Sequence, residues 1–86
     1  MLDREKANLV IGEMITKKRE SLEQYGAGLV KSIADELELS KQSIYHIENG
    51  RGSIRFVDFC VYCKKIGLSK QETAEFFTEI IKRIVY

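Results

Sequence analysis

The chain has 86 residues, of which 44% are hydrophobic and 31% are charged. This length supports one hydrophobic core and excludes two, and the composition excludes a disordered tail, which would contain too few apolar residues to fold. The 14 basic and 13 acidic side chains nearly cancel, so binding to nucleic acid would have to rely on a local basic patch. We expect a single domain over residues 1–86.

Apolar residues occur only in short runs, such as Leu9-Val10-Ile11, whereas a transmembrane helix needs about 20 in succession. The charged N-terminal residues 3–6 are not followed by the apolar stretch and cleavage site of a secretory signal. We therefore expect a cytoplasmic protein that has no membrane partner.

Apolar residues recur at helical spacing along most of the chain, and no segment alternates in the way that predicts a strand. The first helix is expected over about Ala7–Glu23, before a glycine-containing break at Gln24–Gly28. The second is expected over Leu29–Leu37. A third helix over Lys41–Asn49 would begin at Ser40, whose hydroxyl can cap it, and end at a glycine in the left-handed conformation.

Two further helices complete the expected fold. The fourth spans about Arg55–Ile66 and ends at Gly67. The fifth spans about 70–85 and begins with a capping box, in which Ser69 and Glu72 satisfy each other's backbone N–H groups. Proline is absent from the chain, and the pattern as a whole predicts a compact, all-α, five-helix fold.

The two cysteines, Cys60 and Cys63, are three residues apart on the fourth expected helix. A zinc site needs four ligands, and only His46 remains as another soft ligand. A redox-active pair with this spacing ordinarily begins a helix after a strand. We interpret the cysteines as two small core residues, with a redox pair as the alternative, and we expect no metal and no cofactor.

The segment from Val30 to Asn49 has the apolar spacing of two helices that cross steeply after a short turn. Ala34 is small where the helices would cross, and Ile44 and Ile47 would pack the later helix against the earlier one. The stretch KQSIYHIENGR resembles the helix-turn-helix of the phage-repressor, or Cro-type, DNA-binding family. The resemblance extends through FVDFCVYCKKIGLSKQE, which is similar to the fourth helix and the start of the fifth helix of that family.

The resemblance implies a lambda-repressor-like domain, with the helix-turn-helix at about residues 30–49 as helices two and three. It also implies that residues 41–49 form a recognition helix for the major groove of DNA. The candidate DNA-binding residues are Ser40, Lys41, Gln42, Ser43, Tyr45, His46, Asn49, Arg51 and Arg55. Glutamine can bond adenine and lysine can bond guanine, whereas hydroxyls and arginines serve the phosphates. A helix face of this composition can also be an ordinary solvated face.

Three further positions bear on the resemblance. In the family, an arginine of the first helix often pairs with the glutamate before the Asn-Gly stop, and Arg19 and Glu48 match these positions. The family often has glycine in the turn where this chain has Glu38, and a left-handed backbone would cost a non-glycine residue about 1 kcal/mol or more. Val30 stands where the family often has a phosphate-binding glutamine, so that contact is not expected.

The fifth expected helix carries apolar residues in adjacent pairs that recur every four residues. These residues are Phe76, Phe77, Ile80, Ile81, Ile84 and Val85. The stripe is wider than the surface that a small core buries, which favours a two-fold interface with a second copy. The alternative is that the five-helix core of the chain buries the whole stripe. A dimer would hold two recognition helices about 34 Å apart, which is one turn of the duplex.

These features predict a homodimeric, sequence-specific transcriptional regulator that binds an inverted-repeat operator. A regulator of this kind is similar both to compact phage repressors and to the controller proteins of restriction–modification systems. The alternative is a protein–protein module, an antitoxin or adaptor, which Asp35, Glu36 and Glu38 favour. We expect no enzymatic activity, because the sequence lacks a phosphate-binding loop, an acid–base set and a metal-ligand cluster. We also expect no small-molecule ligand.

Overall fold

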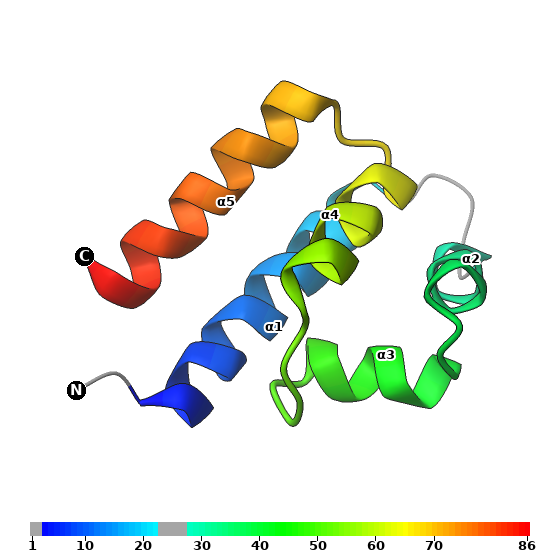
Figure 1. Ribbon diagram of the computed structural model, residues 1–86, viewed down its shortest axis with the longest axis horizontal. Coiled ribbons are helices and arrows are strands. Elements are labelled where there is room, and N and C mark those ends of the chain that lie inside the picture. Colours follow the sequence, from blue (N-terminus) through cyan, green and yellow to red (C-terminus); the bar gives the residue numbers. More distant parts are fainter. Residues whose placement is uncertain (1–2, 23–27) are drawn as a thin grey trace.

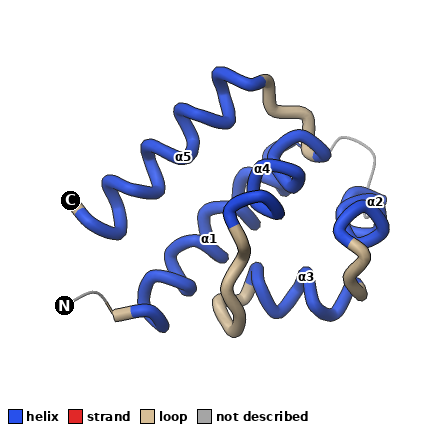
Figure 2. The backbone as a smooth tube through the Cα atoms, viewed as in Figure 1, coloured by secondary structure: helices blue, strands red, loops and turns tan. Residues whose placement is uncertain are grey.

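The computed structural model describes residues 3–22 and 28–86, and in these ranges it contains five α-helices and no strand (Figures 1 and 2). The helices are α1 (Arg4–Leu22), α2 (Gly28–Leu37), α3 (Lys41–Glu48), α4 (Phe56–Lys65) and α5 (Lys70–Val85). The prediction of an all-α chain of five helices is therefore confirmed for the described residues. The break that was predicted at Gln24–Gly28 lies outside them, apart from Gly28.

Side-chain caps explain where three of the helices begin. Asp3 accepts hydrogen bonds from the backbone N–H groups of Glu5 (3.0 Å) and Lys6 (3.3 Å), so α1 starts about one turn earlier than the apolar spacing predicts. Ser40 caps α3, as predicted. The predicted capping box of α5 forms in full at Ser69. Each cap satisfies an N–H group that the helix leaves without an internal partner.

The helices α2, α3 and α4 all end in the same type of turn, in which a residue in the left-handed conformation follows the helix. After α3 and α4 this residue is a glycine, as predicted, namely Gly50 (φ 77°) and Gly67 (φ 97°). After α2 it is Glu38, with φ 56°. There the N–H of Leu39 donates to the carbonyl of Ala34 at 2.9 Å. This turn allows only three residues between α2 and α3, despite the strain of a non-glycine residue.

The core lies where all five helices meet. Its buried apolar residues are Ile15, Val30, Ile33, Ala34, Ile44, Phe59, Tyr62, Cys63, Ile66, Leu68, Phe76 and Ile80. α1 packs against α3 and α5, while α2 packs against α3 and α4. As Figure 1 shows, α2 and α3 lie at one end of the molecule, and both termini lie at the opposite end. None of the described helices is both long enough and apolar enough to cross a bilayer.

Candidate nucleic-acid interface

α3 presents one continuous polar face to solvent. The exposed residues are Lys41, Gln42, Tyr45, His46 and Asn49, which follow the four-residue repeat of a single helix face. Tyr45 is 42% exposed, so it lies on the surface and does not close the edge of the core. In the described part of the chain, no hydrogen bond or ion pair engages these five side chains. They are therefore available to an external partner.

The opposite face of α3 is fixed by a buried ion pair. Glu48 is 6% exposed and Arg19 of α1 is 8% exposed. The guanidinium donates through Nε to one carboxylate oxygen at 2.7 Å and through a terminal nitrogen to the other at 3.0 Å. This hydrogen bonding raises the pKa of Arg19 above its ordinary value. The pair that the family resemblance implied is present, and it positions α3 against α1.

Tyr62 of α4 is a third member of this cluster, and no pattern in the sequence indicates it. Its hydroxyl donates to Oε2 of Glu48 at 2.5 Å and lies 3.2 Å from the carbonyl oxygen of Ile15. Burial and the adjacent carboxylate raise the pKa of Tyr62. A buried carboxylate needs this many donors, because burying an incompletely paired charge is costly. The cluster therefore joins α1, α3 and α4.

Two glycines allow α1 and the end of α3 to touch. A Cβ atom at Gly12 would lie 2.5 Å from the carbonyl oxygen of Glu48, which is closer than a real Cβ atom comes. A Cβ atom at Gly50 would lie 2.7 Å from the Cα atom of Leu9. The backbones are thus in direct contact, and the orientation of α3 follows from this contact as well as from the ion pair. An isolated glycine inside a helix was the sequence signal for such an approach.

The two serines at the start of α3 are partly engaged with each other. Oγ of Ser40 accepts from the backbone N–H of Ser43 at 3.0 Å, and the two hydroxyl oxygens are 3.0 Å apart. One hydroxyl proton is donated within the pair, which leaves the other for an external acceptor such as a phosphate oxygen. The serines act mainly as a cap, and this capping holds the first turn of α3 in place.

The two candidate arginines differ. Arg51 is exposed in the loop after α3, and its side chain makes no ion pair with a described residue. Arg55 is also exposed, but its Nε donates to Asp58 at 2.8 Å. A carboxylate at this distance offsets the positive charge that a phosphate would meet. Lys41 and Arg51 are therefore the unpaired cations that the structure offers beside the exposed face of α3.

The six apolar residues expected at a dimer interface divide into two groups. Phe76 (8% exposed) and Ile80 (4% exposed) belong to the core, so they cannot serve as surface and are removed from the candidate interface. Phe77 and Val85 are exposed, while Ile81 and Ile84 are half-buried. The rotation of α5 about its axis causes this division, because it turns one residue of each adjacent pair toward the core and the other toward solvent.

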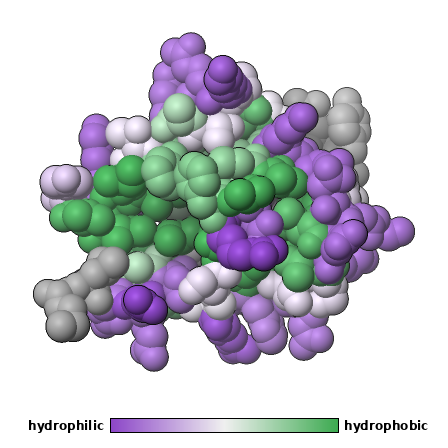
Figure 3. All heavy atoms as spheres, in the orientation of Figure 1, coloured by the Kyte–Doolittle hydropathy of each residue, from purple (hydrophilic) through white to green (hydrophobic). Residues whose placement is uncertain are grey.

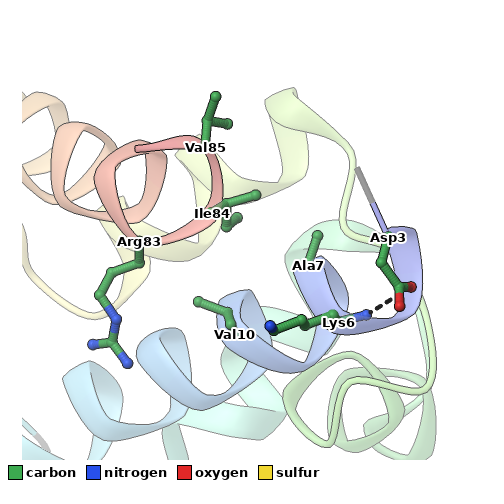
Figure 4. Close-up of a pocket in the computed structure, with 7 residues that line it drawn as sticks. All are labelled: Asp3, Lys6, Ala7, Val10, Arg83, Ile84 and Val85. Atoms are coloured by element: carbon green, nitrogen blue, oxygen red, sulfur yellow. Dashed lines mark hydrogen bonds between the residues drawn. The ribbon is translucent and has the colours of Figure 1, made fainter. Parts of the chain in front are cut away.

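The C-terminal end of α5 shows the same division. It lies beside the first turns of α1, where the two helices enclose an open hollow of about 560 Å³. Figure 4 shows Ile84 directed toward Ala7 of α1, whereas Val85 points away from α1. Val85 is thus the member of the last apolar pair that is turned outward.

The two cysteines lie on α4, away from the exposed face of α3. Cys63 is fully buried and Cys60 is half-buried, and both are free thiols. Burial raises the pKa of Cys63 to about 12, so this thiol is inert near neutral pH. Within the described ranges, no three His, Cys, Asp or Glu side chains are placed to hold a metal ion.

Comparisons of the chain with protein-family models, with curated proteins and with solved structures each found no match.

Proposed function

We propose that this protein is a sequence-specific DNA-binding transcriptional regulator of the Cro-type, phage-repressor-like class. In this proposal α2 and α3 form a helix-turn-helix within a lambda-repressor-like arrangement of the five helices. The observation that supports it best is the face of α3, where five exposed polar side chains have no hydrogen-bond or ion-pair partner among the described residues. A rigidly held helix with a free polar face is what reading base edges in the major groove requires.

Each side chain of the face has a proposed role. Lys41 and Gln42, in the first turn of α3, contact base edges through the ammonium group and the side-chain amide. His46 lies one turn further along the same face, and Tyr45 beside it contacts a thymine methyl group or a phosphate. Asn49, at the end of the face, contacts the outer edge of the DNA half-site.

The remaining contacts position the protein on the backbone of the duplex. Arg51, Ser40 and Ser43 contact phosphates, and the positive end of the α3 dipole supports these contacts. Arg55 contributes only if its bond to Asp58 is exchanged for one to a phosphate. With so few unpaired cations, we expect non-specific binding to be weak and affinity to depend on the base contacts.

The proposed active form is a homodimer. Phe77, Ile81 and Val85 follow one side of α5 at spacings of four residues; Phe77 is 37% exposed, Val85 is 62% exposed and Ile81 is half-buried. Burying this stripe against a second copy would supply a two-fold axis and two recognition helices about 34 Å apart. This arrangement matches an inverted-repeat operator.

One observation favours a second candidate function, a protein–protein module without specific DNA binding. Asp35, Glu36 and Glu38 are all exposed near the end of α2, and in the part of the chain that the structure describes only Glu36 has a cationic neighbour, Lys65, at 3.7 Å. This acidic cluster would repel phosphates if it faced the duplex. It would suit a basic protein partner instead.

Selection from a random duplex library at about physiological salt tests the two candidates. The parent protein is compared with a Lys41→Ala/Gln42→Ala double variant, which keeps every core contact. Enrichment of an inverted repeat by the parent alone supports the DNA-binding proposal. A parent protein that is folded by circular dichroism and enriches nothing would favour the protein–protein module.

The dimer is tested separately by Val85→Asp, which places a charge on the exposed stripe. We expect this variant to sediment as a monomer while keeping its helical content, because Val85 is 62% exposed and lies outside the core. Gln71→Asp adds the same charge to the first turn of α5 and should leave the dimer intact. A Val85→Asp protein that is still dimeric would remove this stripe from the interface.

A further inference from the structure

A second surface of the molecule, between α4 and α5, is apolar and hollowed. Figure 3 shows apolar side chains gathered over these two helices and mainly hydrophilic ones along the edge where α3 lies. The groove has a volume of about 560 Å³, and its polar lining is small compared with its apolar lining. This volume lies within the range of about 300–1,000 Å³ that is usual for small-molecule sites.

Three phenylalanine rings form one end of the groove. The rings of Phe56 and Phe77 meet edge to face with centroids 5.4 Å apart, and the ring of Phe59 lies 5.7 Å from that of Phe77. Phe56 is nevertheless 63% exposed, although it also lines the groove. An exposed aromatic side chain in a concave apolar surface is typical of a place where an apolar group is bound.

Two lysines line the opposite end of the groove. Lys64 lies in the last turn of α4 and Lys70 in the first turn of α5, on the two sides of the connecting turn at Gly67. Both side chains are exposed, and neither forms an ion pair with a described residue. Among the described residues, no acidic side chain lines the groove. Glu72 and Glu75, the nearest acidic residues along α5, line a different hollow, together with Lys18.

We propose that the groove between α4 and α5 binds a small amphipathic anion, with an acyl or aromatic body against the phenylalanines and a carboxylate between Lys64 and Lys70. The occupant is deduced from the charge and shape of the groove. The apolar end excludes a small inorganic anion as the preferred ligand, and the lysines disfavour a cation. From Phe56 to Lys64 the groove follows about 12 Å of α4, which suits an extended acyl chain of medium length.

This inference goes beyond the proposed function and does not depend on it, because the groove and the exposed face of α3 share no residue. It departs from the expectation of no small-molecule ligand. The sequence could not show the groove, because Phe56 and Phe77 are 21 positions apart and come together only when α5 folds back along α4. Phe77 also belongs to the proposed dimer stripe, so the test must follow the oligomeric state.

Decanoate, below its critical micelle concentration, is the probe. Cys60 lines the groove and is half-buried, so its alkylation by iodoacetamide reports occupancy, whereas buried Cys63 does not react in the folded protein. We expect saturating decanoate to slow alkylation of Cys60 at least tenfold. Decyltrimethylammonium, with the same chain and the opposite charge, should protect at least tenfold less well at equal concentration.

Variants separate the two ends of the proposed site. Lys64→Gln/Lys70→Gln should raise the dissociation constant of decanoate at least tenfold. Lys82→Gln is the control, because Lys82 lies on α5 like Lys70 but outside the groove, and it should leave the constant unchanged. Ala74→Phe should abolish binding by filling the groove from its exposed wall, without removing a core contact. Titrations followed by amide chemical shifts give the constants, and circular dichroism confirms that each variant is folded.

Two results would overturn the proposal. One is that decanoate leaves the alkylation of Cys60 and the amide shifts of α4 and α5 unchanged. The other is that decanoate and the cationic probe bind equally and ignore the lysine substitutions, which would indicate general association with an apolar surface. If Ala74→Phe instead converts a dimer to a monomer and decanoate does not bind, the occupant is a second copy of the chain, and the proposed ligand is wrong.

Discussion

The inner and outer faces of α3 differ sharply in how their side chains are bonded. On the inner face, Glu48 is held by Arg19 and Tyr62, and the carbonyl oxygen of Glu48 is in contact with Gly12. On the outer face, side chains such as Gln42 and His46 make no hydrogen bond or ion pair with the described chain. A short helix of eight residues is thus fixed on one side and free on the other.

This difference has a physical reason. An isolated helix of this length is marginal in water, so α3 depends on tertiary contacts for its existence and its orientation. The buried charges supply a unique orientation, since a misplaced carboxylate in the core would lose its donors. The outer face can then carry side chains chosen for a partner. Substitutions should therefore divide into those that change stability and those that change binding.

The largest expected effect comes from breaking the inner face at its ion pair. Arg19→Met leaves Glu48 buried with Tyr62 as its remaining strong donor, and should lower the free energy of unfolding by about 3–5 kcal/mol. Urea denaturation followed by circular dichroism measures the change. Lys17→Met breaks an exposed pair with Glu13 of similar length, 2.8 Å, and should cost no more than about 1 kcal/mol.

If Arg19→Met does not fold at all, a second variant keeps the prediction testable. The double variant Arg19→Met/Glu48→Met removes both buried charges and should be more stable than either single variant. A double variant that is no more stable than Arg19→Met would contradict the view that the unpaired carboxylate causes the loss.

The next effect comes from Tyr62→Phe, which removes one donor to a charged acceptor and should cost about 1.5–3 kcal/mol. Burial and Glu48 raise the pKa of Tyr62 above its ordinary value of 10.0. Because the folded pKa is the higher one, the stabilisation is fully present below pH 10 and is lost as the pH rises toward the folded pKa. The difference in unfolding free energy between the parent and Tyr62→Phe should therefore be constant from pH 7 to 9 and shrink above pH 10. A difference that grows in alkali would exclude this role.

Gly12→Ala tests the backbone contact between α1 and α3. The new methyl group meets the carbonyl oxygen of Glu48, and overpacking of this kind costs about 1–3 kcal/mol. Gly28→Ala is the matched control, because no described atom lies within 4 Å of its added Cβ. We expect the control to be neutral or slightly stabilising in thermal unfolding. Equal melting temperatures for the two variants would mean that α1 and α3 are not in the contact described here.

The smallest effect on stability is expected on the outer face. Gln42→Ala removes an exposed side chain without a partner, and should change the free energy of unfolding by less than about 0.5 kcal/mol. The same substitution should weaken binding to a selected operator by about 1–3 kcal/mol and relax preference at one base pair. Fluorescence anisotropy against a panel of single-base variants of the operator measures both effects. Uniform weakening across the panel would assign Gln42 to a phosphate instead.

The sequence predicted what depends on neighbours along the chain. Ser40, Gly50 and the capping box at Ser69 act within one turn of a helix, so their roles could be deduced from local rules. The ion pair of Arg19 and Glu48 spans 29 positions, and the family resemblance, not the spacing, indicates these two residues as candidate partners.

Contacts that depend on how helices rotate and pack were not predictable in this way. The Tyr62 hydroxyl reaches Glu48 of α3 and the carbonyl oxygen of Ile15 of α1 only once these helices are packed, and a tyrosine among core positions gives no sign of a buried carboxylate. Similarly, Phe76 and Phe77 are adjacent in the sequence, yet one is buried and the other is exposed. Their division depends on the rotation of α5 against the core, which the apolar pattern leaves open.

The most direct test of the central claim is a titration of the ¹⁵N-labelled protein with duplex DNA, either the selected operator or a mixed-sequence duplex at low salt. We expect the largest shifts in amide and side-chain signals on the outer face of α3, at Gln42, Tyr45, His46 and Asn49, and at Arg51 after it. Signals from the groove between α4 and α5 should stay unchanged. Shifts confined to α4 and α5, or no shifts at protein and DNA concentrations in the millimolar range, would contradict the claim that α3 is a DNA-reading helix.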